Sequence, residues 1–283
     1  MSDVAHPHGD APVTLADGFG RRIEYLRISV TDRCNFRCTY CMPKEGLPWL
    51  PREALLSYEE IAEVVRQLAP LGLRRLRITG GEPTIRPQLD TLVAMLRGNA
   101  HVQDIALSTN GVRLPELAPA LRAAGLDRVN MSADSLRADR IVRIARRDLG
   151  FDPVRSLRAA EAAGLAPIKV NVVVMRGVND DEVADFARLT LDHPWHVRFI
   201  ELMPVGELRD LTWEHVVPTD ELLDRLSAVG GLAPDAGPPR GNGPARYYRF
   251  AGAPGTVGVI TPMTHTYCGS CNRVRLTADG RLR

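Results

Sequence analysis

Six short apolar segments recur along the first two thirds of the chain, each followed by an amphipathic stretch with helical periodicity. They cover residues 25–30, 74–79, 104–109, 128–132, 168–174 and 197–202. Strands that alternate with helices in this way pair in parallel, because each helix returns the chain to the start of the next strand. The pattern therefore predicts an α/β fold with a parallel sheet.

Helix-capping residues and Pro- and Gly-rich segments mark the boundaries of these units. Ser57 and Glu60 form a capping-box signature and predict a helix start. Beyond residue 202 the pattern changes to a short helix near 219–226, a Pro- and Gly-rich link at 234–244 and a hairpin of strands at 246–250 and 256–260. We place a domain boundary near residue 230, which separates a partial barrel (1–230) from a small C-terminal segment (231–283).

Each predicted strand is apolar on one face and polar on the other, because successive side chains point to opposite sides of a strand. If the strands curve into an open barrel, the polar set lines its interior and favours a polar, anionic ligand. A half-open sheet with one solvated face is the alternative, although the intervening helices favour the barrel. The polar set consists of Arg27, Ser29, Arg75, Arg77, Thr79, Ser108, Asn130, Ser132, Lys169 and Asn171.

Three closely spaced cysteines, Cys34, Cys38 and Cys41, follow the first strand. Iron–sulfur clusters are normally held by four thiolates, so three thiolates leave one iron of a four-iron cluster open to a small molecule. A zinc site would need a fourth ligand, and no histidine lies between His8 and His101. A disulfide would leave one thiol unpaired. The spacing favours an iron–sulfur cluster with an open coordination position.

Two further motifs contain residues that are suited to binding a ligand or a metal. Gly80, Gly81, Glu82 and Pro83 follow the second strand, at the carboxyl end where ligand-binding loops of parallel folds gather. Glycines there allow the backbone to approach a ligand closely.

The second cysteine motif lies near the end of the chain, where Cys268 and Cys271 precede Arg273 and Arg275. On an extended segment these two guanidinium groups point the same way, and such groups suit phosphate. A metal centre beside a phosphate clamp is the favoured interpretation; a zinc knuckle or a redox dithiol is the alternative.

The composition limits the classes of partner that the protein is expected to bind. The formal charge is only +2, from 36 basic and 34 acidic residues, so no global field attracts nucleic acid or an anionic membrane. No apolar run has the length of a membrane span, and the polar start does not resemble a signal peptide. Five cysteines, an odd number, fit metal chemistry in a reducing compartment. We expect a cytoplasmic protein that acts on a small molecule.

Taken together, these motifs closely resemble one family of radical S-adenosylmethionine (SAM) enzymes, the GTP cyclases that begin molybdenum cofactor biosynthesis. The likeness runs from about residue 19 to the last residue, and its motifs lie at 26–38, 77–83, 108–111, 169–172, 198–203 and 268–275. The resemblance implies an incomplete (β/α)6 TIM-type barrel. It also implies contacts to SAM from Tyr40, Gly81, Ser132 and Met203, and contacts to GTP from Arg27, Arg77, Ser108, Lys169, Arg273, Val274 and Arg275.

The same resemblance implies the chemistry. Cys34, Cys38 and Cys41 would hold a SAM-binding [4Fe–4S] cluster, and Cys268 and Cys271 would belong to a second one. A deoxyadenosyl radical would take hydrogen from the ribose C3′ of GTP, whose carbon then attacks C8 and gives (8S)-3′,8-cyclo-7,8-dihydroguanosine 5′-triphosphate. The resemblance gives a catalytic role to Arg27, Arg273 and Arg275.

The implied enzyme is a lyase, either monomeric or dimeric. It would take electrons from a donor such as flavodoxin or ferredoxin, and it would pass its product to cyclic pyranopterin monophosphate synthase. The nearest enzyme alternative is another radical SAM protein with an auxiliary cluster, and the alternative of another class is an inactive iron–sulfur protein that only binds nucleotide.

One departure from the family pattern concerns the second cluster. The family has a third cysteine further along, followed by a segment ending in two glycines, whereas this sequence ends at Arg283. We expect a truncated sequence in which Cys268 and Cys271 lack their third partner.

Overall fold

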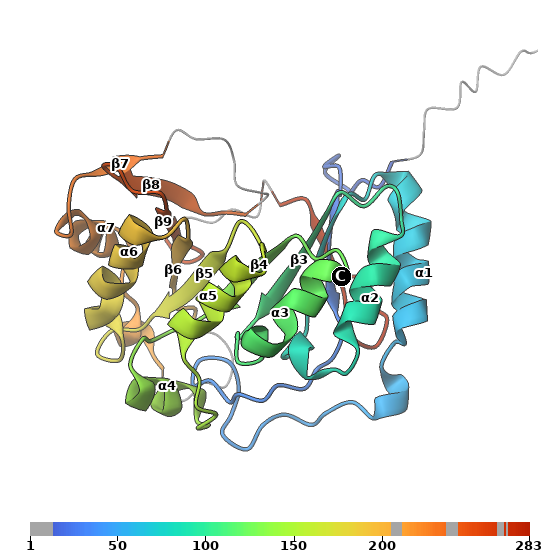
Figure 1. Cartoon of the computed structure of the whole chain (residues 1–283), viewed down its shortest axis with the longest axis horizontal. Helices are drawn as coiled ribbons and strands as arrows, with labels where there is room; N and C mark the ends of the chain where they lie inside the picture. Colours follow the sequence, from blue (N-terminus) through green and yellow to red (C-terminus); the bar gives the residue numbers. More distant parts are fainter. Residues whose placement is uncertain (1–13, 205–210, 236–242, 265–268, 270) are drawn as a thin grey trace, which may run out of the picture.

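The computed structural model describes residues 14–204, 211–235, 243–264, 269 and 271–283. A single ten-stranded sheet, with its helices packed along one side, forms the body of the molecule (Figure 1). The order across the sheet is β10-β1-β2-β3-β4-β5-β6-β9-β8-β7. The strands are β1 (Tyr25–Ser29), β2 (Arg75–Thr79), β3 (Asp104–Thr109), β4 (Arg128–Ser132), β5 (Lys169–Val174), β6 (His196–Glu201), β7 (Leu232–Pro234), β8 (Arg246–Phe250), β9 (Thr256–Ile260) and β10 (Arg273–Leu276).

The six expected strands are confirmed as β1 to β6, with ends shifted by at most one residue at each boundary. They pair in parallel in chain order. The sheet stays open, since no pairing joins the outer strands β10 and β7 in the described part of the chain. The incomplete barrel is therefore confirmed.

The C-terminal segment adds strands to both sides of this barrel. The expected hairpin forms between β8 and β9, and β9 also pairs in parallel with β6. At the opposite edge β10 pairs in parallel with β1. The alternation pattern did not predict these parallel pairings, because the sequence predicts no helix directly before either strand. The proposed boundary near residue 230 stays a prediction, with strands from both sides sharing one sheet.

Two of the helices begin at a side-chain cap, Ser57 for the first and Asp152 for the fifth. Ser57 Oγ accepts a bond from the Glu60 N–H at 3.1 Å, and the Ser57 N–H donates to Glu60 Oε2 at 2.7 Å, so the expected capping box is confirmed. The helices are α1 (Tyr58–Leu68), α2 (Leu89–Arg97), α3 (Leu114–Ala123), α4 (Ala138–Ala145), α5 (Pro153–Ala162), α6 (Val183–Asp192) and α7 (Thr219–Ser227).

The hydrophobic core lies between these helices and one face of the sheet. Its strand residues are the expected apolar ones, among them Ile28, Ile78, Leu107 and Val129, all fully buried. The other face keeps the polar side chains, so the two faces differ as their alternation predicts. Within the described ranges, no helix is both long and apolar enough to cross a bilayer.

Candidate active site at the carboxyl ends of the strands

The three clustered cysteines lie in the loop after β1, and all three are free thiols. Two backbone hydrogen bonds fasten this loop to the last carbonyls of α4: Arg37 N–H to Ala145 O at 2.8 Å and Thr39 N–H to Ile144 O at 3.0 Å. These carbonyls have no partner within the helix, so the loop completes the helix end. The Arg37 guanidinium also donates to Cys34 O at 2.6 Å. The loop is thus held by elements distant in sequence.

The chemistry of the thiols fits a cluster. Burial raises the pKa of Cys34, Cys38 and Cys41, so in the absence of metal the three are neutral thiols. Metal binding replaces these protons, because the thiolate is the ligand form. No three of the described Cys, His, Asp and Glu side chains converge as a single metal ion requires. Three thiolates from one loop are ligands of the type that hold iron–sulfur clusters in proteins.

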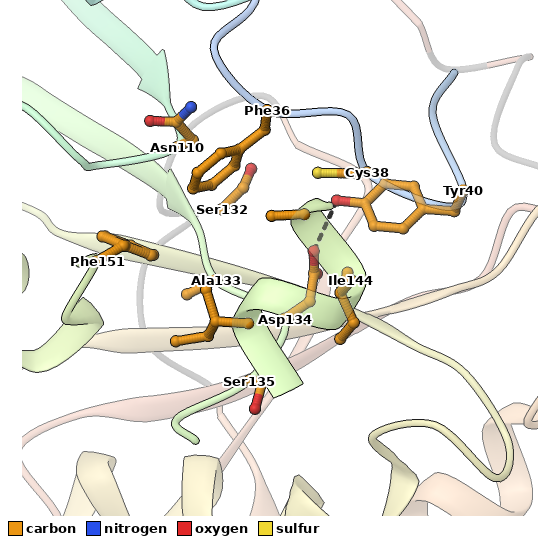
Figure 2. A pocket seen from close by; sticks show the side chains of 12 residues that line it. Phe36, Cys38, Tyr40, Asn110, Ser132, Ala133, Asp134, Ser135, Ile144 and Phe151 are labelled. Carbon is orange, nitrogen blue, oxygen red and sulfur yellow. Dashed lines mark hydrogen bonds between the residues drawn. The ribbon is translucent and has the colours of Figure 1, made fainter. Parts of the chain in front are cut away.

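A cavity opens beside Cys38. Figure 2 shows Tyr40 and Cys38 entering it from the cysteine loop, opposite Asp134 and Ser132 from the end of β4. The Tyr40 hydroxyl donates to Asp134 Oδ2 at 2.7 Å, and the Val173 N–H donates to Oδ1 at 2.8 Å. Burial raises the pKa of Asp134 to about 6 despite these two donors. The cavity combines an aromatic ring, a hydroxyl and a carboxylate next to the cluster loop.

The two glycines after β2 pack against the cysteine loop itself. A Cβ on Gly81 would lie 2.2 Å from Arg33 O, and one on Gly80 would lie 2.6 Å from Thr31 O. Two backbone bonds join these segments, Gly81 N–H to Thr31 O and Glu82 N–H to Arg33 O, each at 2.8 Å. The lack of a side chain at these glycines therefore lets two loops of the chain pack together. From the sequence, we expected only a close approach of the backbone to a ligand.

Glu82 is buried, and donors from the chain surround its carboxylate. It accepts from Thr84 N–H, Thr84 Oγ1, Thr109 Oγ1 and Asn110 N–H at 3.0, 2.5, 2.7 and 2.6 Å. Asn110 continues the connection by donating to Asn35 Oδ1 at 2.7 Å. Glu82 thus connects the loops after β2 and β3 to the cysteine loop, and its carboxylate has a structural role.

Three arginines lie side by side across the polar face of the sheet. Arg27 on β1 is in register with Arg77 on β2 and with Arg275 on the edge strand β10. Burial, together with Arg198, Arg128 and Arg27, lowers the pKa of Arg77 to about 10. The buried Nε of Arg77 has no partner among the described residues. Like charges on neighbouring strands destabilise a sheet, so this row suits an anion.

A second row crosses the middle of the same face. Ser108, Asn130, Lys169 and His196 are in register on β3 to β6. Burial lowers the pKa of Lys169 to about 6, and the nearby arginines, Arg198 first among them, act in the same direction. The arginine row thus makes this face cationic, and the second row makes it polar, in agreement with the polar interior that the alternation predicts.

Near the end of the chain, the described part of the second cysteine motif places a thiol beside an arginine. Arg273 Nε lies 3.3 Å from Cys271 Sγ. Burial acts to raise the pKa of Cys271, but the side-chain and backbone hydrogen bonds from Arg273, together with the charges of Arg273 and Arg21, lower it overall. Cys268 lies outside the described residues. Alternation places Arg273 and Arg275 on the polar face, whereas Val274 packs against the hydrophobic core.

The structure thus brings together part of the set implied for SAM. Tyr40 and Ser132 line the cavity beside Cys38, Gly81 lies behind the cysteine loop, and Met203 is 43% exposed after β6. Sequence reasoning missed Asp134. Its position directly after a strand, at the carboxyl edge, was the available signal, because the same rule had identified the Gly-Gly-Glu-Pro turn.

Comparisons with known proteins agree with this geometry. The profile of the Radical SAM superfamily matches residues 28–190, and that of Molybdenum Cofactor Synthesis C matches residues 195–283. The chain is 50% identical over 269 residues to a GTP 3′,8-cyclase of Heliobacterium modesticaldum, covering 95% of this chain and 82% of the relative. It is 49% identical to that of Pelotomaculum thermopropionicum, covering 95% and 83%.

Two solved structures share the fold at low sequence identity. Streptococcus suis SuiB bound to S-adenosylmethionine aligns with a TM-score of 0.62 and 13% identity, over 92% of this chain and 59% of that chain. Methylornithine synthase (PylB) aligns with a TM-score of 0.56 and 16% identity, over 75% and 64%. With the sequence matches above, the chain belongs to the radical SAM superfamily and, within it, to the GTP 3′,8-cyclase family.

Proposed function

We propose that this chain converts GTP to (8S)-3′,8-cyclo-7,8-dihydroguanosine 5′-triphosphate by radical SAM chemistry, a lyase reaction in molybdenum cofactor synthesis. The observation that carries the proposal is the register of Arg275, Arg27 and Arg77 across the polar face. Guanidinium groups pair with phosphate oxygens through two parallel bonds, so three of them in register suit a triphosphate. The relatives' activity agrees with a triphosphate substrate.

Cys34, Cys38 and Cys41 would hold the [4Fe–4S] cluster, and SAM would occupy the cavity beside Cys38. When bound, the cluster supplies the electron that cleaves SAM reductively. Tyr40 and Ser132 line this cavity, and Asp134 fixes the Tyr40 hydroxyl. These residues would orient the adenosyl group toward the polar face, where the arginine row holds the triphosphate. Holding both molecules in fixed orientation is the main contribution that the protein makes to such chemistry.

Further parts of the proposal concern the C-terminal motif and the partners. We propose that Cys268 and Cys271 contribute to a second [4Fe–4S] cluster and that Arg27, Arg273 and Arg275 assist at the substrate. The remaining contacts proposed are Gly81 and Met203 to SAM, and Ser108, Lys169 and Val274 to GTP, the last through its backbone. A flavodoxin or ferredoxin would supply electrons, and cyclic pyranopterin monophosphate synthase would take the product.

The test is the formation of 5′-deoxyadenosine by the anaerobically reconstituted chain with SAM and dithionite, with and without GTP. A GTP-dependent yield together with a cyclised nucleotide product supports the proposal. A yield that does not respond to GTP points to another substrate, and no yield with an assembled cluster contradicts the activity. A Cys38→Ser variant should lose the yield, whereas a Cys271→Ser variant should still cleave SAM.

A further inference from the structure

Arg37 lies inside the cysteine loop, between Cys34 and Cys38, and its side chain folds back onto that loop. Its Nη1 donates to Cys34 O at 2.6 Å and to Phe36 O at 2.7 Å. Because both carbonyls point toward one donor, the first half of the loop wraps around the guanidinium group. The carbonyl and the Sγ of Cys34 belong to one residue, so a positive charge lies close to a ligand of the cluster.

The cover over this guanidinium group comes from the segment that follows the third cysteine. The Cζ of Arg37 lies 5.1 Å from the centre of the Trp49 ring, within the range of a cation–π contact. Gly46 packs on the same group: its φ is +91°, and a Cβ there would lie 3.2 Å from Arg37 Nε. This Nε is buried and has no partner among the described residues. The ring and the glycine backbone therefore exclude water from this part of the guanidinium group.

No carboxylate forms an ion pair with Arg37 in the described part of the chain. Its partners there are two carbonyl oxygens and an aromatic ring. Asp32, the nearest acid along the sequence, accepts a backbone N–H at 2.5 Å, and Glu45, the next one, is exposed. The buried acids of the site, Glu82 and Asp134, bind donors of their own. The charge of Arg37 is therefore not cancelled by a direct partner.

A positive charge at this place acts on an electron that the cluster takes up. Reduction makes an iron–sulfur cluster more negative by one charge, and its potential depends on net charge, hydrogen bonds to sulfur and exposure to solvent. A nearby cation favours the reduced form. The effect is larger where water is excluded, because the Coulomb energy grows as the dielectric constant falls. The Phe36 N–H acts in the same direction, since it lies 3.4 Å from Cys34 Sγ as a donor.

We infer that Arg37 raises the reduction potential of the cluster held by Cys34, Cys38 and Cys41, and that its charge rather than its hydrogen-bond geometry is responsible. The inference rests on the cluster of the proposed function and does not depend on GTP. Arg37 does not line the cavity beside Cys38. It therefore acts through the cluster and not through contact with SAM.

The test compares three variants of the full chain, all in a Cys271→Ser background so that the signal comes from the first cluster. Arg37→Gln removes the charge and retains a donor for the carbonyls. Arg37→Lys keeps the charge and loses the planar group that reaches both oxygens. Arg33→Gln is the matched control, because Arg33 directly precedes Cys34 but is exposed, where water and salt screen its charge.

The measurement is the midpoint potential of the anaerobically reconstituted cluster without SAM or GTP, followed by electron paramagnetic resonance of the reduced form. At a fixed potential, we expect Arg37→Gln to lower the ratio of reduced to oxidised cluster about tenfold, which corresponds to about 59 mV for one electron. Arg37→Lys and Arg33→Gln should each change this ratio less than about threefold. Iron and sulfide content should stay unchanged in all three variants.

A neutral variant that assembles no cluster still leaves the role of the charge open to test. The potential of Arg37→Lys should fall as the pH is raised through the pKa of the introduced amine, ordinarily about 10.4, because deprotonation removes the charge. The unaltered chain should show no such fall, since a guanidinium group stays protonated in this range. A pH-independent potential in Arg37→Lys would contradict the inference.

Other results would overturn it as well. A shift in Arg33→Gln as large as that in Arg37→Gln would mean that net charge rather than position sets the potential. An equally large shift in Arg37→Lys would assign the effect to the bonds with the carbonyls. Loss of the cluster from Arg37→Lys would give the arginine a structural role alone. An assembled cluster that yields no 5′-deoxyadenosine with SAM and dithionite contradicts the proposed function, whereas the comparison of potentials still decides the role of Arg37.

Discussion

The Tyr40 hydroxyl donates a 2.7 Å hydrogen bond to Asp134 Oδ2 and thereby joins the cysteine loop to the end of β4. The two residues are 94 positions apart, and each belongs to a segment that lines the same cavity. The bond therefore fixes the width of this cavity between the loop that would carry the cluster and the sheet.

Replacing Tyr40 by phenylalanine should loosen this connection. Asp134 would retain the Val173 N–H but lose its second donor, and a buried acceptor that loses a partner costs about 1–2 kcal/mol in the free energy of unfolding. Affinity for SAM should fall as well, because the ring is no longer held. Chemical denaturation and equilibrium binding measure the two effects. Tyr248→Phe on β8 is the control, and equal losses in both variants would contradict the role of the bond.

Adding a methyl group at Gly81 should displace the cysteine loop. Its Cβ would lie 2.2 Å from Arg33 O, a contact with backbone that cannot relax locally. We expect Gly81→Ala to lose about 3 kcal/mol or more in the free energy of unfolding and to bind less iron after reconstitution. Gly231→Ala is the matched control, since a Cβ there meets nothing within 4 Å. Normal iron content in the Gly81 variant would show that the two loops can separate without loss.

Removing a charge from the arginine row should have opposite effects on stability and on binding. Arg77 is buried beside other cations, so Arg77→Met should raise the free energy of unfolding by about 1–2 kcal/mol in the absence of nucleotide. The same variant should bind GTP about 10–100-fold more weakly, because a phosphate partner is lost. Arg66→Met, at an exposed position, should change neither quantity appreciably. A variant that loses stability along with affinity would contradict the account of the row.

Lys169 should take up a proton when GTP binds. Its pKa is lowered to about 6 in the free protein, so above that pH the amine is largely neutral, and an adjacent triphosphate favours the charged form. Above about pH 6 the affinity for GTP should therefore fall as pH rises. Calorimetry at about pH 8 in buffers of different ionisation enthalpy measures the uptake. Lys169→Met should show none, and an unchanged uptake would assign the proton elsewhere.

The same depressed pKa has a consequence for folding. Between pH 6 and 10.5 the unfolded chain binds more protons at Lys169 than the folded chain does. The contribution of Lys169 to the free energy of unfolding therefore increases with pH across that window. The unfolding free energy of the unaltered chain should therefore rise relative to that of Lys169→Met as pH increases from about 6 to about 9. A constant difference between the two proteins would contradict the shift.

The sequence by itself determined the repeating units and the two faces of the sheet. Alternation within each segment separates Ile28 from Arg27 and Leu107 from Ser108, because side chains on a strand point to opposite sides whatever the rest of the fold does. The same local rules predicted the capping box at Ser57 and, through short-range spacing, the cysteine loop. The resemblance to a known family indicated which ligands to expect, namely SAM, GTP and the iron–sulfur clusters.

Only the tertiary structure decided which distant segments meet. The pairing of β10 with β1 brings Arg275 into register with Arg27, and no local pattern encodes that register, since these neighbouring strands come from distant parts of the sequence. The bond from Tyr40 to Asp134 and the close passage of Gly81 by Arg33 arise in the same way. Such contacts depend on three-dimensional packing between segments far apart in the chain, whereas periodicity is a property of consecutive residues.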